Sequence, residues 1–418
     1  MLGPTDEFPI HQIPQPIAWP GASDRNFYDR SYFNAHDRTG DIFLITGIGY
    51  YPNLGVKDAF VLVRRGDTQT AVHLSDGIDS DRLNQHVLGY RVEVSEPLHK
   101  LRIILEETDG IAVDLTWNGL FDVIQEQRHV LRSGTRVTLD AQRFAQVGSW
   151  AGSIAIDGEE IKVDPDVWIG SRDRSWGIRP IGEAEPAGRP ADPPFEGMWW
   201  LYVPMAFDDF AICLIIQEEP NGFRSLNDVT RIWRGGRVEQ MGWPRVKIHY
   251  TSGTRIPTGA TIEATAQDGS PVRFDVESKL PVPIHVGGGY GGDSDWLHGM
   301  WKGDKFTERL TYDMTDPAIV GRAGFGSSTT WDARCASRTA SPSRAGACSS
   351  TARSAGTTRR ASPTGSPSPP STCDFGVVSR GERDPLHRNR KEEGGRGHSF
   401  DQKIEPVRIE RRSFVEHR

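Results

Sequence analysis

Short runs that alternate apolar with polar residues, each closed by a turn-type cluster, restrict the fold of this 418-residue chain more than any other feature. The alternation is clear over residues 90–107 and 111–119, and Gly-Asp, Asp-Gly or Gly-Gly pairs separate other runs. A period of two places every second side chain on one face, which suits a half-buried antiparallel sheet. Helical periodicity is almost absent, and only residues 81–88 fit a short helix. The sequence therefore predicts an all-β protein.

The strand-like runs form two series of similar size, which favours two antiparallel β-barrels or sandwiches. We expect an irregular Pro-rich arm over residues 1–25 and a first β domain over residues 26–165. A turn-rich segment over residues 166–196 then connects it to a second β domain over residues 197–326. The rest of the chain, residues 327–418, has a different composition.

Between Ser327 and Cys373 the chain contains no Ile, Leu, Val, Met, Lys, Glu, Asn or Gln. Such a segment cannot bury a core, so a disordered tail is expected from Ser327 onward. One explanation is a Ser/Arg/Pro linker. The explanation we favour is a shift of reading frame in GC-rich DNA, which would leave the second domain without its last strands and with an open edge.

Charge and composition exclude several classes of function. Residues 1–326 carry 32 Lys and Arg against 46 Asp and Glu, so this acidic body is a poor ligand for nucleic acid. It contains no long apolar segment and no signal-peptide pattern, which argues against a membrane span. Its single cysteine, Cys213, suits a reducing cytoplasm. The oligomeric state is left open by the sequence.

The strongest candidate site lies in residues 171–177, where Asp173 stands between Arg172 and Arg174 and is followed by Trp176. This group suits a general acid, a substrate anchor or a structural ion pair. Burial against Trp176 would raise the pKa of Asp173, whereas the two arginines would lower it.

Aromatic residues follow in a strand-like run, in which Trp200 and Tyr202 face one side and Trp199 the other. One set lines an apolar cavity, or both pack in ordinary cores. Glycines, Tyr290, Trp296 and His298 gather in residues 285–301, where tight loops over a ligand are possible.

Cofactor motifs are missing from the body of the chain, which has no phosphate loop, Cys-x-x-Cys pair or dinucleotide fingerprint. His285 and His298 lie too far apart in sequence for a compact metal-ligand motif. We therefore expect neither a cofactor nor a metal site.

The motifs GSRDRSWGIRP, GMWWLYVPMAFDDF, GWPRVKIHY and HVGGGYGGDSDWLHGMWKG, in this order, resemble a family of uncharacterised bacterial proteins related to the AttH-like and carotenoid 1,2-hydratase group. The resemblance covers residues 20–326. It implies two lipocalin-like β-barrel domains, as in tocopherol cyclase, and a hydrophobic small-molecule ligand. It also implies that Asp173 corresponds to an aspartate that protonates an alkene, although the flanking arginines depart from the family's motif.

These observations favour a cofactor-independent hydratase, dehydratase, isomerase or cyclase that acts on a hydrophobic terpenoid- or steroid-like molecule. In this hypothesis Asp173, Tyr290 and His298 carry the chemistry. Ligand contacts come from Trp176, Trp199, Trp200, Tyr202, Trp296, Arg172 and Arg174. The competing hypothesis is a non-catalytic protein that binds such a molecule.

The frame-shift hypothesis predicts the codons of the gene. GC-rich codons for residues 327–336, read from their third base, give Val-Asp-His-Val-Gly-Arg-Ala-Val-Cys, in which the apolar alternation of a strand returns. Sequencing the gene should show codons that restore such alternation across residues 327–373. Codons that yield no alternation in the shifted frame would rule the hypothesis out.

Overall fold

The computed structural model describes most of the body of the chain and parts of its tail. The described residues are 2–181, 199–253, 257–290, 293, 295–320, 327–337, 348–351 and 371–379. Every described residue belongs to one compact unit, Met1–Gly381.

A large antiparallel sheet contains the strands of the first half. In the described residues its order is β21-β4-β3-β2-β1-β13-β11-β8-β7-β6-β5, and β9, β10 and β12 pair with β11. The strands are β1 Phe27–His36, β2 Ile42–Tyr51, β3 Val56–Arg65, β4 Thr68–Gly77, β5 Gln85–Val87, β6 Tyr90–Glu96, β7 Lys100–Thr108, β8 Ile111–Gly119, β9 Ile124–Gln125, β10 His129–Ser133, β11 Arg136–Ile156, β12 Glu159–Val163, β13 Ile169–Ile178 and β21 Phe306–Asp313.

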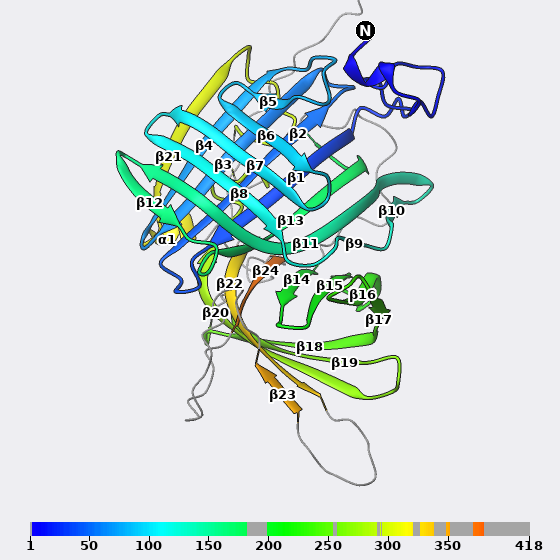
Figure 1. Ribbon diagram of the computed structural model, residues 1–418, viewed down its shortest axis with the longest axis vertical. Helices are drawn as coiled ribbons and strands as arrows, with labels where there is room; N and C mark the ends of the chain where they lie inside the picture. Colours follow the sequence, from blue (N-terminus) through cyan, green and yellow to red (C-terminus); the bar gives the residue numbers. More distant parts are fainter. Residues whose placement is uncertain are drawn as a thin grey trace, which may run out of the picture. The chain divides into compact units, whose positions relative to one another are not determined.

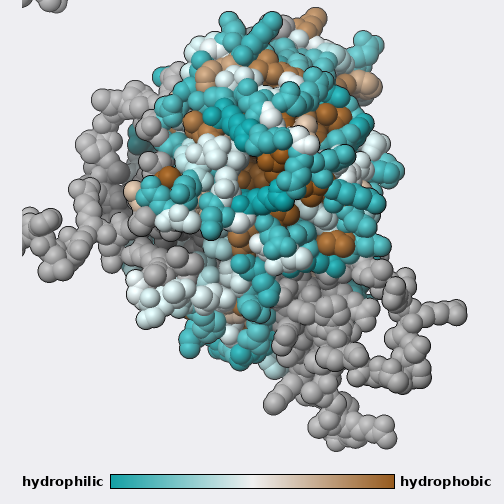
Figure 2. Space-filling model, turned by 90° about the vertical axis from the view of Figure 1, so that its left-hand side faces the viewer, coloured by the Kyte–Doolittle hydropathy of each residue, from teal (hydrophilic) through white to brown (hydrophobic). Residues whose placement is uncertain are grey.

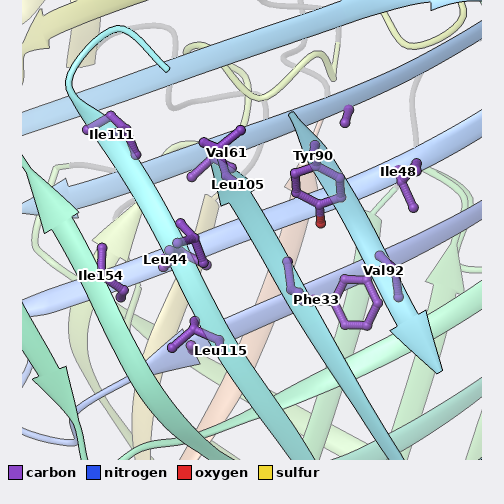
Figure 3. Close-up of a cluster of buried hydrophobic side chains, with 14 of the residues drawn as sticks. Phe33, Leu44, Ile48, Val61, Tyr90, Val92, Leu105, Ile111, Leu115 and Ile154 are labelled. Atoms are coloured by element: carbon purple, nitrogen blue, oxygen red, sulfur yellow. The ribbon is translucent and has the colours of Figure 1, made fainter. Parts of the chain in front are cut away.

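This sheet curls on itself, so that β6, β7 and β8 cross over β1, β2 and β3 (Figures 1 and 3). Alternate residues of the crossing strands fill the space between them, as Leu44 and Val61 on one side and Leu105 and Leu115 on the other show (Figure 3). The curl buries one face of this sheet, which runs from β21 at one edge to β5 at the other. The interior of this half-barrel is therefore a packed core.

A second antiparallel sheet has the order β17-β16-β15-β14-β24-β22-β20-β19-β18, with β23 paired to β22 (Figure 1). Its own core is made by residues such as Leu201, Ile212 and Phe274. The strands are β14 Trp199–Ala206, β15 Phe210–Glu218, β16 Arg224–Trp233, β17 Val238–Gln240, β18 Gly242–Tyr250, β19 Pro257–Thr265, β20 Pro271–Val282, β22 Ser327–Ser337, β23 Cys348–Thr351 and β24 Ser371–Ser379.

The all-β class and the hairpins predicted from turn residues are confirmed. For example, β11 and β12 turn at Asp157–Gly158, and β14 and β15 at Asp208–Asp209. The predicted helix over residues 81–88 is wrong. The side chain of Asp81 accepts hydrogen bonds from the backbone N–H groups of Leu83 and Asn84, and β5 follows. The helices described are the short η1 Pro4–Glu7 and α1 Pro317–Val320.

The sheets do not follow the predicted domain boundaries at every strand. β21, expected in the second half, pairs with β4 of the large sheet. The tail expected to lack regular structure contains β22, β23 and β24, and β22 pairs with both β20 and β24. Backbone hydrogen bonds to an open strand edge do not require apolar side chains, which explains why a Ser- and Thr-rich segment can extend the sheet. The division into two domains itself stays a prediction.

Hydrophilic side chains cover most of the face shown in Figure 2, with hydrophobic side chains in patches between them. The apolar side chains of the same sheets are buried. Polar side chains outside and apolar side chains inside are what the alternation predicts for half-buried strands. No helix in the described parts of the chain has the length and hydrophobicity needed to cross a membrane.

At Gly170, on β13, the neighbouring strands β1 and β11 approach closely. A Cβ atom there would overlap the carbonyl oxygen of Asn34 and lie 2.9 Å from Trp150 Nε1, which donates a 2.7 Å hydrogen bond to that oxygen. Gly170→Ala should therefore lower the free energy of unfolding by about 1–3 kcal/mol, the usual cost of overpacking. Urea denaturation measures this value.

Gly77→Ala is the matched control, because the nearest atom to a Cβ there, Asp304 Oδ1, is 4.0 Å away. Its denaturation midpoint should stay at the wild-type value. Equal midpoints for Gly170→Ala and Gly77→Ala would contradict the close approach of β1 and β13.

Candidate functional site

A cavity of about 350 Å³ lies between the two sheets. The large sheet contributes residues of β1, β11 and β13, the second sheet contributes residues of β14 and β15, and the loop after β20 closes one side. Its walls combine aromatic rings with arginine, histidine and carboxyl groups. This combination is typical of a small-molecule site, in which an apolar surface carries a few polar groups.

The cavity borders the outer face of the large sheet, which is the face turned away from the half-barrel core. The alternation along β13 decides which side chains reach the cavity. Asp173 and Ser175 line the cavity. Arg172, Arg174 and Trp176, at the intervening positions, lie on the opposite face because successive residues of a strand point to opposite sides. The predicted grouping of Asp173 with its three sequence neighbours is therefore wrong.

Each of those three neighbours has a role elsewhere. Arg172 donates a 2.7 Å hydrogen bond to Gln146 Oε1 and lies over the ring of Trp117. Arg174 forms a 3.0 Å ion pair with Asp29. Trp176 is 39% exposed, so it cannot bury Asp173. The predicted ligand contacts of these side chains do not occur at this cavity.

Pairing between distant strands supplies the real neighbours of Asp173. On the cavity face, Arg30 of β1, Ser175 of β13 and Arg143 of β11 are partners in one row across three strands. Tyr32, Asp173 and Ala145 form the next row. Arg30 and Arg143 are thus diagonal neighbours of Asp173, at a spacing of about 7–8 Å that long side chains can span. Two guanidinium groups therefore flank the carboxyl from neighbouring strands.

Burial raises the pKa of Asp173, and the positive charges of Arg143, Arg30 and Arg179 oppose this effect without cancelling it. Asp173 is half-buried and lines the cavity. A carboxyl group in such a setting can hold a proton and release it to a bound molecule.

Arg143 is held in place from behind the cavity. Its Nε donates a 2.6 Å hydrogen bond to Glu126 Oε2, and its guanidinium lies over the rings of Trp200 and Tyr202. Glu126 is buried, and burial raises its pKa against the lowering effect of Arg143. Cys213 Sγ lies 3.8 Å from Glu126 Oε1, and burial raises the pKa of this thiol well above its usual value.

Arg30 is held by two side chains of the glycine-rich segment 285–301. One of its terminal nitrogens donates to Tyr290 Oη at 3.1 Å and to His298 Nε2 at 2.8 Å. His298 therefore accepts at Nε2, and burial together with the charge of Arg30 lowers its pKa well below the usual value. Tyr290 lines the cavity, whereas His298 lies behind Arg30 and is not part of the lining.

Glycine makes this arrangement possible. Gly289 has a φ of 75°, and a Cβ atom there would lie 2.9 Å from His298 Nε2. Asp293 accepts a 2.9 Å hydrogen bond from the backbone N–H of Gly287, which fixes the turn of the same loop. Gly289 therefore serves close packing over His298, and Gly287 serves the turn of the loop.

The predicted aromatic residues divide between the cavity and the cores. Trp200 and Tyr202 line the cavity, while Trp199 packs against the core of the second sheet, as the alternation predicts. Trp296 is fully buried and stacks on His73 with ring centroids 4.2 Å apart, so it is a core residue and not a ligand contact.

Sequence reasoning missed Arg179, which directly follows β13, and the groups that come from elsewhere in the sheet: Arg30, Arg143, Glu126, Asp58 and His129. The signal that could have found them was a charged residue at an otherwise apolar, inward-facing position, as Arg30 is in FYDRSYF and Arg143 in RFAQV. His129 lines the cavity, and burial together with Arg143 lowers its pKa to about 4. No cluster of metal-ligating side chains occurs within the described residues.

The chain belongs to the Family of unknown function (DUF8625), whose model matches residues 2–342. This family carries no assigned activity. No curated protein matches the chain in sequence.

Several solved structures are similar to the chain at low identity. An AttH protein of Nitrosomonas europaea is 9% identical, with 84% of this chain and 92% of that chain covered and a TM-score of 0.47. Kievitone hydratase of Nectria haematococca is 11% identical, with 84% and 88% covered and a TM-score of 0.44. CghA is 11% identical, with 86% and 90% covered and a TM-score of 0.47. Values this low do not transfer a function to this chain.

Asp58, on β3 in the same cross-strand row as Arg30, gives a pH prediction. It accepts hydrogen bonds from Gly299 N–H at 2.6 Å and from Tyr51 Oη at 3.1 Å, and its Oδ2 lies 3.9 Å from His298 Nδ1. Burial raises the pKa of Asp58 from 3.8 to about 6, although Arg30 and these hydrogen bonds lower it.

Between these two pKa values the folded chain holds a proton that the unfolded chain has released. The stability contributed by Asp58 is therefore greatest below about pH 4 and falls by about 3 kcal/mol as the pH rises to about 6. Urea denaturation of the wild type and of Asp58→Asn at pH 4 and pH 7 should show this extra loss in the wild type alone. Parallel losses in both proteins would contradict the raised pKa.

Proposed function

We propose that this member of a family without an assigned function is a cofactor-independent enzyme that transfers protons to and from a hydrophobic small molecule. The reaction classes that fit are hydration, dehydration, isomerisation and cyclisation. The observation that supports the proposal most is the position of Asp173, a carboxyl with a raised pKa that faces an aromatic cavity. A terpenoid- or steroid-like skeleton remains the substrate class suggested by the sequence resemblance.

Asp173 would act as the general acid. In a hydration, its protonated carboxyl donates the proton to one carbon of a carbon–carbon double bond, which leaves a carbocation on the other carbon. Water adds to that carbon and returns a proton to the Asp173 carboxylate, so that the net change is the addition of one water molecule. Arg143 and Arg30, whose charges already act on Asp173 in the free protein, stabilise the transient carboxylate.

Other cavity residues would position the substrate. The rings of Trp200 and Tyr202 supply an apolar wall, and Tyr290 Oη supplies a polar contact next to Arg30. His298, which accepts from Arg30 behind the lining, would orient that guanidinium and would not touch the substrate. The roles of Asp173, Tyr290 and Trp200 thus follow the sequence hypothesis, whereas that of His298 becomes indirect.

A non-catalytic binding protein is the alternative function, and the aromatic cavity supports it equally well. The two functions differ in proton transfer. An enzyme of the proposed kind should move protons between solvent and carbon atoms of its ligand, whereas a binding protein should leave the ligand unchanged.

Deuterium incorporation separates the two functions even where the product is unidentified. A hydrophobic extract of bacterial cells is incubated in D₂O with the full chain. The bound molecules are recovered, and their masses are measured by mass spectrometry. We expect the wild type to introduce deuterium at carbon. Asp173→Asn should bind the same molecules and lose most of the exchange, by about 100-fold or more, as general acid–base catalysis contributes about 10²–10⁴-fold.

Asp29→Asn is the matched control, because Asp29 lies on β1 but pairs with Arg174 on the opposite face of the sheet. It should retain both binding and exchange. Exchange that persists in Asp173→Asn would remove Asp173 from the mechanism, and bound molecules without any exchange in the wild type would favour the binding protein.

A further inference from the structure

The hydrogen bonds of Arg30 leave part of its guanidinium open to a ligand. The residue is 5% exposed, and its two hydrogen bonds both leave from one terminal nitrogen. Both partners, Tyr290 Oη and His298 Nε2, are neutral acceptors. Within the described residues no carboxylate lies at ion-pair distance from Arg30. A guanidinium has five N–H donors, so Nε and the other terminal nitrogen can still bind an acceptor.

Arg143 and Arg179 complete a cationic group around the same space. Arg143 uses Nε for Glu126, which leaves its two terminal nitrogens outside that hydrogen bond. Arg179 lines the cavity and lies over the ring of Tyr28, with its guanidinium 5.3 Å from the ring centroid. Among the described residues, the cavity lining therefore contains three guanidinium groups and one carboxyl group, that of Asp173.

Two other described carboxyl groups near these arginines, those of Glu126 and Asp58, are not part of the lining. Glu126 accepts a hydrogen bond from Arg143 Nε, and Asp58 lies in the cross-strand row of Arg30, next to His298. They balance buried positive charge, but neither is part of the lining. Of the histidines that line the cavity, His129 is held neutral by burial, since its pKa is lowered to about 4. The ligand-facing surface is thus richer in hydrogen-bond donors for an anion than in acceptors.

We propose that the molecule bound in this cavity carries an acidic oxygen, as a carboxylate, enolate or phenolate, next to its hydrophobic body. Arg30 and Arg143, which flank Ser175 in one cross-strand row, would hold this oxygen, and Arg179 would add its charge. Guanidinium groups bind such oxygens through short, charge-assisted hydrogen bonds. The aromatic wall of Trp200 and Tyr202 would take the hydrophobic part.

This inference rests on the proposed function in placing the substrate in the Asp173 cavity, and it narrows the substrate class. A neutral hydrocarbon would leave the free donors of Arg30 without an acceptor in a partly dry site, which is costly. An anionic oxygen in the adjacent row would also favour the protonated form of Asp173, the form that a general acid needs.

A pair of isosteric probes tests the charge preference without the natural substrate. Naphthoate and naphthamide have the same aromatic body and differ in charge. We expect isothermal titration calorimetry on the full chain to give a roughly 10- to 100-fold lower Kd for naphthoate, the range that hydrogen bonds to a charged group supply. Equal affinity, or tighter binding of naphthamide, would overturn the inference.

Two substitutions locate the effect. Arg30→Met and Arg179→Met should each weaken naphthoate binding, Arg30→Met by about tenfold or more, and leave naphthamide binding unchanged. Arg179 makes only a ring contact among the described side chains, so Arg179→Met keeps the test decisive even if Arg30→Met does not fold. Arg174→Met is the matched control on the opposite face and should bind both probes as the wild type does. A preference for naphthoate that survives Arg30→Met and Arg179→Met would contradict the site.

Asp173→Asn separates this inference from the proposed function. It should retain the preference for naphthoate, because the arginines remain, while it loses the exchange of deuterium. A chain that shows the preference but no exchange in the wild type would support anion binding and contradict catalysis. A chain that shows deuterium exchange but no preference for naphthoate would support catalysis and contradict anion binding.

Discussion

The attraction between Asp173 and guanidinium groups of neighbouring strands is the interaction on which the site depends. A carboxyl group between two sheets loses hydration, which disfavours its charge, and arginines one row away on the neighbouring strands recover part of this loss. The result is a carboxyl whose pKa is raised but which is not isolated from positive charge. Such a group is suited to reversible proton transfer more than to a fixed ion pair.

The two sheets keep this environment closed through apolar contacts on either side of the cavity. One cluster joins Val147 of β11 to Ile215 of β15, and another joins Phe60 of β3 to Val282 of β20. Apolar burial of this kind holds the sheets together and limits water near the carboxyl. The half-barrel interior, filled by its own core, is not the binding chamber. The chamber is the space that remains where the outer face of the large sheet meets the second sheet.

Period-two alternation allowed the strands, the hairpins and the opposite directions of Trp199 and Trp200 to be predicted from local sequence. The same rule, applied to β13, shows why Arg172 and Arg174 cannot be the partners of Asp173, although they are its neighbours in sequence. The true partners are more than a hundred residues away, on β1, or about thirty residues away, on β11. Only the pairing register brings them together, and periodicity within one segment carries no information about that register.

The central claim is that partial burial of Asp173, at a cavity that it shares with three arginines, raises the pKa of its carboxyl group above the ordinary value. A ¹³C NMR titration of the aspartate carboxyl carbons, with the Asp173 signal assigned by its loss in Asp173→Asn, measures this directly. We expect a pKa above the ordinary value of 3.8. A pKa at or below 3.8 would show that the arginines outweigh burial, and Asp173 would then be a structural ion-pair residue.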